Sequence, residues 1–146
     1  MANNVTGFGF VVSIIASVTF PTGFTFTQAS DDADPLDFAS IKIGDAQMGV
    51  NGDIIIYNKA VPLPMVVNVI PGSVDDINLQ TLANANRAVQ GKQITNDVIT
   101  VTIVYPDKTT HIFSNGVITD AQFSSSISGA GRLKTKQYSF LFQSFS

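Results

Sequence analysis

The sequence predicts a mainly β protein, a β-sandwich or barrel-forming sheet with one flanking α-helix at about residues 74–89. Three observations favour this fold class. Apolar and polar residues alternate with a period of two through much of the chain, which is typical of strands with one buried face. Glu, a strong helix former, is absent, and all eleven acidic residues are Asp. Only residues 73–89 show a clear helical spacing of apolar residues.

The N-terminal segment predicts a pair of strands. Phe8, Phe10 and Val12 alternate with their neighbours, which indicates a first strand. "PTG" at residues 21–23 is expected to turn the chain into a second strand, "FTFTQ". This opening has no charge before Asp31, but polar residues and Pro21 interrupt it well before the ~20 apolar residues of a membrane span. A buried strand pair is therefore expected, and no membrane contact.

The next segment predicts an acidic loop followed by short strands. Residues 30–40 are polar, acidic and interrupted by Pro35. "IKIGDAQMGVNGDIIIYN" at 41–58 indicates two short strands around a tight Asn51-Gly52 turn. An extended acidic loop or hairpin is thus expected around residues 30–53, and another strand at 65–70.

The predicted helix begins with a capping signal. Ser73 can cap the first turn, and Asp76 occupies the capping-box position three residues later. Apolar residues then recur at helical spacing and are expected to face the sheet: Val74, Ile77, Leu82, Ala85 and Val89.

After the helix the chain returns to strands. Residues 97–105 and 109–113 predict a hairpin around Pro106-Asp107. Asn115-Gly116 is expected to turn the chain into a further short strand at 117–123. Residues 132–146 alternate throughout and predict a closing strand.

The closing strand is expected to change from cationic to aromatic along one face. In "GAGRLKTKQYSFLFQSFS", residues 129–146, alternation places six side chains together: Arg132, Lys134, Lys136, Tyr138, Phe140 and Phe142. The aromatic half should lie over the core, and the cationic half should project toward solvent or a neighbour. A phosphate-binding loop is not predicted, because the G-x-x-x-x-G-K-[ST] order is not met and a strand follows instead of a helix.

The charges are unevenly distributed. Residues 1–80 hold eight Asp against two Lys, a balance of −6, whereas residues 81–146 hold three Asp against six basic residues, a balance of +3. The net charge of −3 disfavours general nucleic-acid binding. The asymmetry favours association between copies, acidic patch to basic patch.

The residues predict no catalytic site, no metal site and no cofactor. His111 is the one histidine and stands in a predicted strand, where a cross-strand role is expected, and no G-x-S-x-G motif is present. The acidic cluster lacks EF-hand spacing, and its bidentate Glu cannot exist in this chain. We interpret that cluster as a solvated or partner-facing loop: Asp31, Asp32, Asp34 and Asp37.

Three segments together resemble the tail tube protein of contractile-tailed bacteriophages. They are "ADPLDFASIKIGDAQMGVNGDIIIYNKAVPL", "PGSVDDINLQTLANANRA" and "ITDAQFSSSISGAGRLKTKQYSFLFQSF". Their shared order is an acidic loop, a helix in mid-chain and a closing strand "GRLKTKQYSFLF". The resemblance covers most of the chain and rests on pattern and order. It implies a single tail-tube-like domain over residues 1–146, related in architecture to type VI secretion tube proteins.

The resemblance implies a structural subunit, not an enzyme. Its strands would join those of neighbours in stacked, hexameric rings that form the hollow inner tube of a contractile tail, the conduit for genome ejection. The implied partners are the protein itself and the sheath, baseplate and tail-terminator proteins. The tape measure protein and double-stranded DNA would pass through the lumen without specific binding. The implied location is the virion tail, assembled in the bacterial host cytoplasm.

A hypothesis for the contact between subunits follows. Arg132, Lys134 and Lys136 are expected to meet acids of a neighbouring subunit, with Asp31, Asp32, Asp34 and Asp37 as the best candidates. The pattern does not identify the lumen-lining residues. The alternative from another class is a β-sandwich binding module, lectin-like or adhesin-like.

Overall fold

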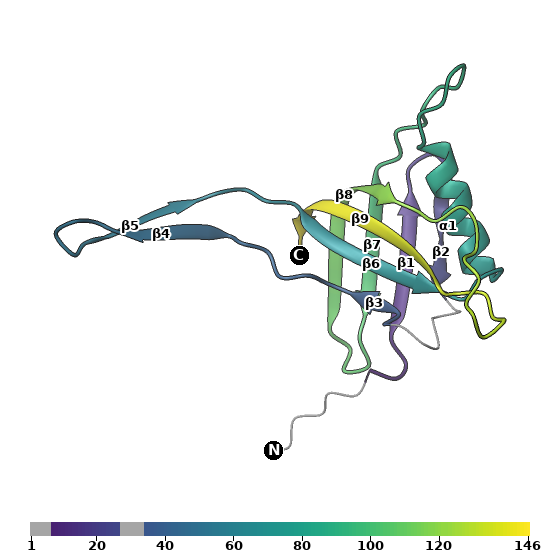
Figure 1. The fold of residues 1–146 in the computed structure, drawn as a ribbon, viewed down its shortest axis with the longest axis horizontal. Coiled ribbons are helices and arrows are strands. Elements are labelled where there is room, and N and C mark those ends of the chain that lie inside the picture. Colours follow the sequence, from purple (N-terminus) through teal and green to yellow (C-terminus); the bar gives the residue numbers. More distant parts are fainter. Residues whose placement is uncertain (1–6, 27–33) are drawn as a thin grey trace.

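The computed structural model describes residues 7–26 and 34–146 (Figure 1). It confirms the predicted fold class, since one curled sheet and one helix make up the body of the molecule. In chain order the elements are β1 (Val11–Ala16), β2 (Phe20–Phe26), β3 (Leu36–Asp37), β4 (Gly44–Met48), β5 (Ile54–Asn58), β6 (Leu63–Val69), α1 (Val74–Ala85), β7 (Ile99–Val104), β8 (Thr110–Asp120) and β9 (Lys136–Phe145).

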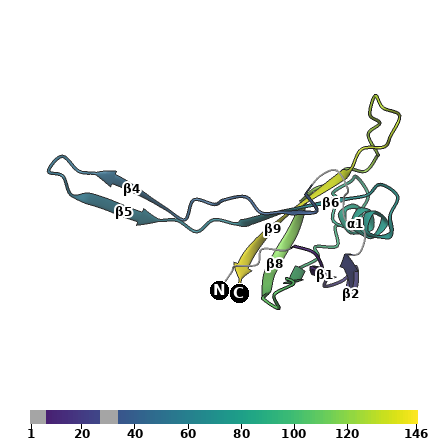
Figure 2. The ribbon, with the colours of Figure 1, turned by 90° about the horizontal axis from the view of Figure 1, so that it is seen from below.

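Seven of the strands form one antiparallel sheet in the order β2-β1-β7-β8-β9-β6-β3. The sheet curls into a half-barrel, and α1 lies within its concave side (Figure 2). Alternate side chains of β1, β6, β7 and β9 point to this side and form the core with Leu79, Leu82 and Ala83 of the helix. We call the two sides of the sheet the concave face, which holds the core, and the convex face.

The first strand pair lies later in the chain than predicted. The turn is at residues 17–19, and Pro21 and Gly23 lie inside β2. β2 is an edge strand, and Pro is tolerated in edge strands because only one side of such a strand carries ladder hydrogen bonds. Gly23 has φ +78°, and a Cβ on it would lie 2.9 Å from the Ile14 carbonyl oxygen. The Pro and Gly residues are therefore accommodated by the sheet edge and do not form a turn.

The turn predicted at Asn115-Gly116 is also wrong. β8 runs without a break from Thr110 to Asp120, and Asn115 takes φ 54° where the pairing with β7 shifts register. Gly116 lies under the Phe142 ring, where a Cβ would come within 2.3 Å of a ring carbon. The glycine thus permits close packing across a bulge.

The helix is shorter than predicted and turned about its axis. Ser73 is the N-cap, as predicted, and its Oγ accepts the Asp76 N–H at 3.2 Å. Val74 and Ile77, expected to face the sheet, are 63% and 57% exposed. The buried positions are Asp75, Asp76, Leu79, Leu82 and Ala83. The helix is turned in this way because Asp76 faces inward and binds a buried partner in the core, which is described below.

The predicted hairpin around Asn51-Gly52 is confirmed. β4 and β5 pair with each other, and the Gly49 and Gly52 backbone groups close the turn. The hairpin and its two connections project far from the sheet (Figures 1 and 2). We call residues 38–62 the arm. Part of the acidic loop expected before it is the short edge strand β3, and residues 27–33 lie outside the described residues.

Within the described part of the chain, no helix has the length and hydropathy to cross a membrane.

Candidate assembly surfaces

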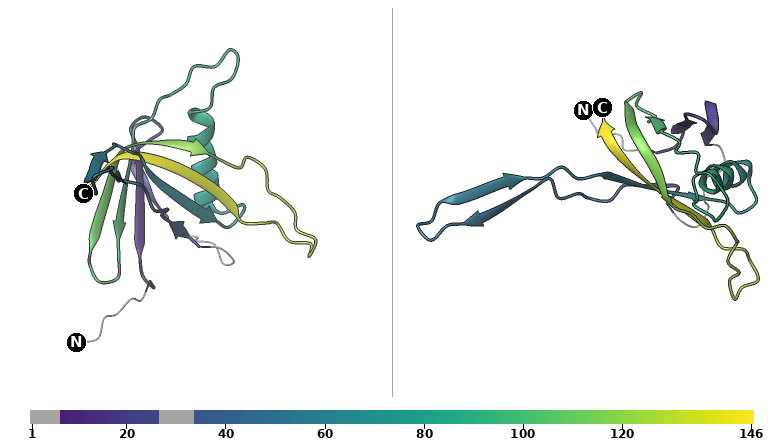
Figure 3. Two further views of the ribbon diagram at one scale, coloured as in Figure 1. Left: turned by 60° about the vertical axis from the view of Figure 1, so that its left-hand side comes forward. Right: turned by 90° about the horizontal axis from the view of Figure 1, so that it is seen from above.

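The predicted row of three cations does not form one surface. β9 begins only at Lys136, and Arg132 and Lys134 lie in an exposed loop, residues 121–135. This loop folds on itself, with the Ser128 N–H donating to the Arg132 carbonyl at 2.8 Å and a bridge between Ile127 and Leu133. It projects from the body on the side away from the arm (Figure 3). Arg132 and Lys134 are exposed, as predicted, but they are not part of a strand.

Lys136 was expected to project toward a neighbour, and this is wrong. Its side chain is buried, at 3% exposure, and its Nζ lies 3.1 Å from Asp76 Oδ1. Lys136 is the first core-facing residue of β9, where the strand starts beside the first turn of α1. A cation at that position requires a buried counter-charge, and Asp76 supplies it. Lys136 therefore cannot reach another subunit.

The same carboxylate serves as acceptor for two further groups. The Tyr138 hydroxyl donates to Asp76 Oδ1 at 2.8 Å, and the Gly72 N–H donates to Asp76 Oδ2 at 2.9 Å. Burial, then the hydrogen bond and the negative charge of Asp76, raise the pKa of Tyr138 far above its usual value. Tyr138 therefore remains a neutral donor. This network fixes the rotation of α1 with Asp76 inward, and so turns Val74 and Ile77 outward.

Two of the four acidic candidates, Asp34 and Asp37, lie at the same end of the sheet as the start of β9. Asp31 and Asp32 fall outside the described residues, whereas Asp34 and Asp37 are exposed. Asn68 of β6 donates its side-chain N–H to the Asp34 carbonyl oxygen at 2.6 Å and pairs across the ladder with Gln137 of β9. Pairing of this acidic end with the basic loop of a neighbour stays a prediction. Among the described residues, no group of three or more His, Cys, Asp or Glu is placed to hold a metal ion.

A second polar cluster, which the sequence did not reveal, closes the other end of the helix. Asp97 Oδ1 accepts the Val18 and Thr19 N–H groups at 2.8 and 2.9 Å, and Oδ2 accepts the Asn86 side-chain amide at 2.9 Å. Asn86 is the C-cap of α1. Burial alone would raise the pKa of Asp97, but the hydrogen bonds from Thr19, Asn86 and Val18 outweigh it and lower that pKa. Asp97 thus ties the helix to the β1–β2 turn.

The arm exposes apolar side chains that its own chain does not cover. Each large apolar side chain in its outer part is more than half exposed: Ile43, Met48, Val50, Ile54, Ile55, Ile56 and Tyr57. The register places Ala46, Met48, Ile54 and Ile56 together on one face. We call this the apolar face of the arm. An isolated two-stranded hairpin is only marginally stable in water, and exposed apolar patches mark interaction sites.

The opposite face of the arm is more polar. Asp45 accepts the Tyr57 hydroxyl at 2.9 Å across the two strands and lies 3.2 Å from Lys42 Nζ. The Tyr57 hydrogen bond, then Lys42 and the Ala46 N–H, lower the pKa of Asp45. The arm is therefore amphipathic, with Ile55 on the more polar side.

Aromatic rings join the root of the arm to the sheet. Phe38 stacks on Phe113 with ring centroids 5.1 Å apart, and Phe113 contacts Phe145 at 5.1 Å. His111 continues the row by stacking on Phe145 at 5.0 Å, which places it among cross-strand aromatic contacts, as expected. Phe38, Phe113 and Phe145 also line an apolar hollow of about 220 Å³ at this root.

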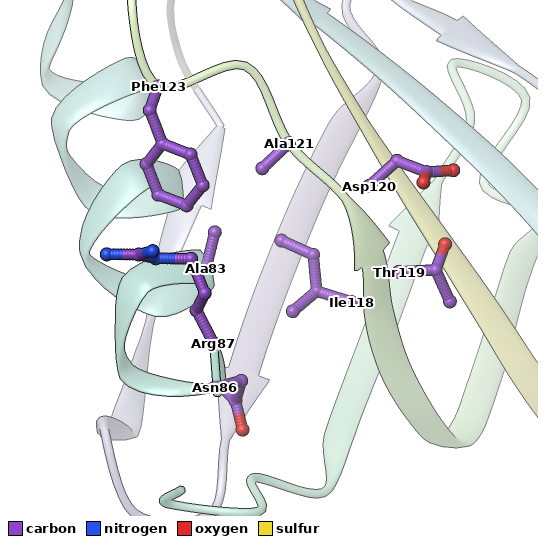
Figure 4. Close-up of a pocket in the computed structure, with 8 residues that line it drawn as sticks. All are labelled: Ala83, Asn86, Arg87, Ile118, Thr119, Asp120, Ala121 and Phe123. Carbon is purple, nitrogen blue, oxygen red and sulfur yellow. The ribbon is translucent and has the colours of Figure 1, made fainter. Parts of the chain in front are cut away.

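Another hollow, of about 300 Å³, lies between α1 and the end of β8 (Figure 4). Arg87 approaches the Phe123 ring from the helix side, with its guanidinium carbon 5.3 Å from the ring centroid. Gln80 also donates to the Phe123 carbonyl oxygen at 3.2 Å. These contacts fasten the beginning of the 121–135 loop to the helix.

Comparison with known families places the chain among tail proteins. Residues 3–146 match the family described as tail fiber protein gp32. The chain belongs to this family. No curated protein matches it.

Solved structures with a similar fold come from contractile injection systems. A chain in the anti-feeding prophage baseplate has a TM-score of 0.59 and 12% identity, covering 100% of this chain and 96% of that one. A chain in the PVC sheath-tube complex in its extended state has a TM-score of 0.58, 14% identity and 92% coverage of that chain, against 100% of this one. A chain in the anti-feeding prophage tube-terminating cap has a TM-score of 0.57, 13% identity and 91% coverage, again against 100%.

These likenesses show a shared fold for this member of the tail fiber protein gp32 family. The alignments cover the whole length of this chain. The predicted relation to tail proteins is confirmed at the level of the family, while the specific role of tube subunit goes further than the family description.

Proposed function

We propose that this protein is a structural subunit that assembles with copies of itself into stacked, hexameric rings, the hollow inner tube of a contractile tail. The observation that carries the proposal is the arm. Its apolar face is solvated in a single chain, and covering it requires another molecule. A second copy is the partner that is always present at the needed stoichiometry.

The edges of the sheet support the same proposal. β2 ends the sheet on one side, and on the other side β3 pairs with β6 only at Leu36 and Asp37. The backbone of Leu63–Met65, at the start of β6, has no strand partner on that side among the described residues. Half-barrels with open edges can close by sharing strands with neighbours, which removes edges that would otherwise template aggregation.

The comparisons support a place in such an assembly. Chains of the same fold occur in structures described as a sheath-tube complex, a baseplate and a tube-terminating cap. By analogy we propose that this protein contacts sheath, baseplate and terminator proteins in the virion tail. The tape measure protein and double-stranded DNA would pass through the channel.

The contact between subunits is proposed in a corrected form. Arg132 and Lys134 remain the basic candidates, and Asp34 and Asp37, with Asp31 and Asp32, the acidic ones. Lys136 is removed from the set because its charge is used inside the subunit.

The experiment compares two faces of the arm. The variant Ile54→Ser/Ile56→Ser changes the apolar face, and Ile55→Ser, on the opposite face, is the control. Burying an Ile contributes about 1.5–3 kcal/mol, so two lost side chains should raise the concentration needed for assembly on the order of 10² to 10⁴-fold. Negative-stain microscopy and sedimentation velocity measure assembly, and thermal unfolding checks that the monomer is intact.

Three results would contradict the proposal. Dispersed wild-type monomers at every concentration would favour a lectin-like or adhesin-like binding module. Slender rods without a channel would favour a fibre, the role that the family description names. Tubes formed equally well by the Ile54→Ser/Ile56→Ser variant would show that the arm does not hold subunits together.

A further inference from the structure

The chain contains two Asn-Gly pairs, which the fold places in very different surroundings. Asn51-Gly52 lies at the tip of the arm, and Asn115-Gly116 lies inside β8. An Asn side chain followed by Gly can react with the backbone, because glycine has no Cβ to block the approach and rotates freely. Since the two pairs share this chemistry, a difference in their reactivity would come from the fold.

The turn at the tip of the arm holds its glycine nitrogen by a local hydrogen bond. The Gly52 N–H donates to the Gly49 carbonyl oxygen at 3.0 Å, and the Gly49 N–H donates to the Asp53 carbonyl oxygen at 2.7 Å. Asn51 and Gly52 are exposed, and a Cβ on Gly52 would meet no atom within 4 Å. The turn lies at the far end of the projecting arm (Figure 1). Rotation of the Asn51-Gly52 peptide therefore breaks a local contact at an open tip.

The pair in β8 is held from both sides. Gly116 is buried and pairs with Ile99 of β7 and with Phe142 of β9. The Phe142 ring also lies so close to Gly116 that a Cβ would not fit. Bringing this glycine nitrogen to the Asn115 side chain requires the sheet to open. Opening an exposed turn costs little, whereas opening core strands approaches the cost of global unfolding.

The reaction available to Asn51 is intramolecular deamidation. The Gly52 backbone nitrogen loses its proton and attacks the side-chain carbon Cγ of Asn51, which lies on the neighbouring residue. The new N–Cγ bond closes a five-membered succinimide, and the Cγ–Nδ2 bond breaks as Nδ2 takes up a proton and leaves as ammonia. Water then opens the ring. Cleavage of the N–Cγ bond gives aspartate, whereas cleavage of the original peptide bond gives isoaspartate, so the net reaction consumes one water and releases one ammonia.

We propose that Asn51 is a self-modification site, where a subunit converts the uncharged amide at the tip of its arm into a carboxylate, while the sheet protects Asn115. The assignment of the site depends only on the fold of a single chain. Its effect on assembly rests on the proposed tube function, because that function requires the arm to be covered by another copy.

Both products change the arm next to its apolar face. Isoaspartate adds one carbon atom to the main chain, and the length of a hairpin loop sets the register of its strands. The pairing of Met48 with Ile54, which directly flanks the turn, depends on that register. Either product also places a second carboxylate two residues from Asp53, beside the fully exposed Val50. A partner that covers the tip would have to desolvate these charges, so conversion of Asn51 weakens the contact.

Peptide mapping by mass spectrometry tests the site. Folded monomer is incubated at mildly alkaline pH, and trypsin then isolates Asn51 between Lys42 and Lys59, and Asn115 between Lys108 and Arg132. Asn51 should convert at least about tenfold faster than Asn115, because only the latter needs the sheet to open. In urea, where both pairs are unfolded, this difference should largely disappear. Equal rates in the folded protein, or a difference that persists in urea, would overturn the assignment.

The variant Asn51→Gln is the matched control for the effect on assembly. Its side chain is one methylene longer and must close a six-membered ring, which is much slower. Freshly prepared wild type and Asn51→Gln should form tubes alike under negative-stain microscopy. After parallel incubation, wild type should lose assembly in proportion to the converted fraction of Asn51, whereas Asn51→Gln should keep it. Both losses of amide and of assembly should accelerate as the pH rises, because the reaction begins with removal of the Gly52 amide proton.

The outcomes separate this inference from the proposed function. If fresh wild type forms no tubes, the proposed function fails, while the peptide maps still decide whether Asn51 is the reactive site. If fully converted protein assembles as well as Asn51→Gln, the proposed effect on the arm is wrong. If Asn51→Gln loses assembly as fast as wild type, the loss has another cause, and the effect of Asn51 is equally overturned.

Discussion

The body and the arm depart from the usual distribution of residues in opposite ways. The body buries charged groups, Asp76 and Lys136, beneath the helix, and it satisfies them within the chain. The arm exposes apolar groups, such as Ile54 and Ile56, and its own chain does not cover them. The buried charges of the body are therefore satisfied within the chain, whereas we propose that another molecule covers the apolar side chains of the arm. Substitutions in the body should therefore change mainly the folding stability of the monomer, whereas substitutions in the arm should change mainly assembly.

The largest effect on folding is expected from Lys136→Met. Removing the cation leaves Asp76 buried with an uncompensated charge, and breaking a buried pair in this way costs about 3–5 kcal/mol. Urea unfolding of the monomer measures the change. The double variant Lys136→Met/Asp76→Asn should lose less than Lys136→Met, because it removes the stranded charge as well. A loss of under about 1 kcal/mol for Lys136→Met would contradict the internal pairing.

Asp97→Asn should have a smaller, pH-dependent effect. Its carboxylate accepts hydrogen bonds from Val18, Thr19 and Asn86, and such bonds to a charged group contribute about 1.5–3 kcal/mol. Because folding lowers the pKa of Asp97, this stability is present above its unfolded pKa of about 3.9 and is lost as the pH falls through the folded pKa. The difference in unfolding free energy between wild type and Asp97→Asn should therefore shrink in acid. A difference that stays constant from pH 7 to pH 3 would contradict this account.

The same contrast explains what the sequence could predict. Alternation correctly put Lys136 on the same face as Tyr138, Phe140 and Phe142, because register is a local property. It could not show that Asp76, sixty residues earlier in the chain, neutralises the cation. The same missing information put Val74 and Ile77 on the wrong side of the helix, since helical spacing does not reveal a buried acid.

Turn signals succeeded or failed according to their tertiary surroundings. Asn51-Gly52 turns the chain, as predicted, at the exposed end of the arm, where local conformational preference decides. Asn115-Gly116 carries the same signal but lies within the sheet, where packing of Phe142 on Gly116 and pairing with β9 maintain a continuous strand. The sequence could not predict that the arm projects from the body. The arm projects because it lacks contacts that would hold it against the body, and a local sequence pattern does not reveal missing contacts.

The smallest effect on folding, with a large effect on assembly, is expected from Arg132→Asp/Lys134→Asp. These exposed residues lie in the 121–135 loop, so the unfolding free energy of the monomer should change by less than about 0.5 kcal/mol. Reversed charges would face the acids of the neighbour, and tubes should not form at concentrations where wild type assembles. Lys92→Asp/Lys108→Asp makes the same change in charge elsewhere and serves as the control.

Mixing two variants then distinguishes contacts between subunits from contacts within one. We expect no tubes from either variant alone, neither from Arg132→Asp/Lys134→Asp nor from Asp34→Lys/Asp37→Lys. If the two variants alternate around a ring with an even number of positions, every contact between neighbours again pairs opposite charges. An equimolar mixture should therefore form tubes. The rival explanation is attraction between these charges inside one subunit, because Asp34 lies near the start of β9. Mixing the two variants does not restore an attraction of that kind. A mixture that stays unassembled, from variants that remain folded, would rule out the proposed pairing between subunits.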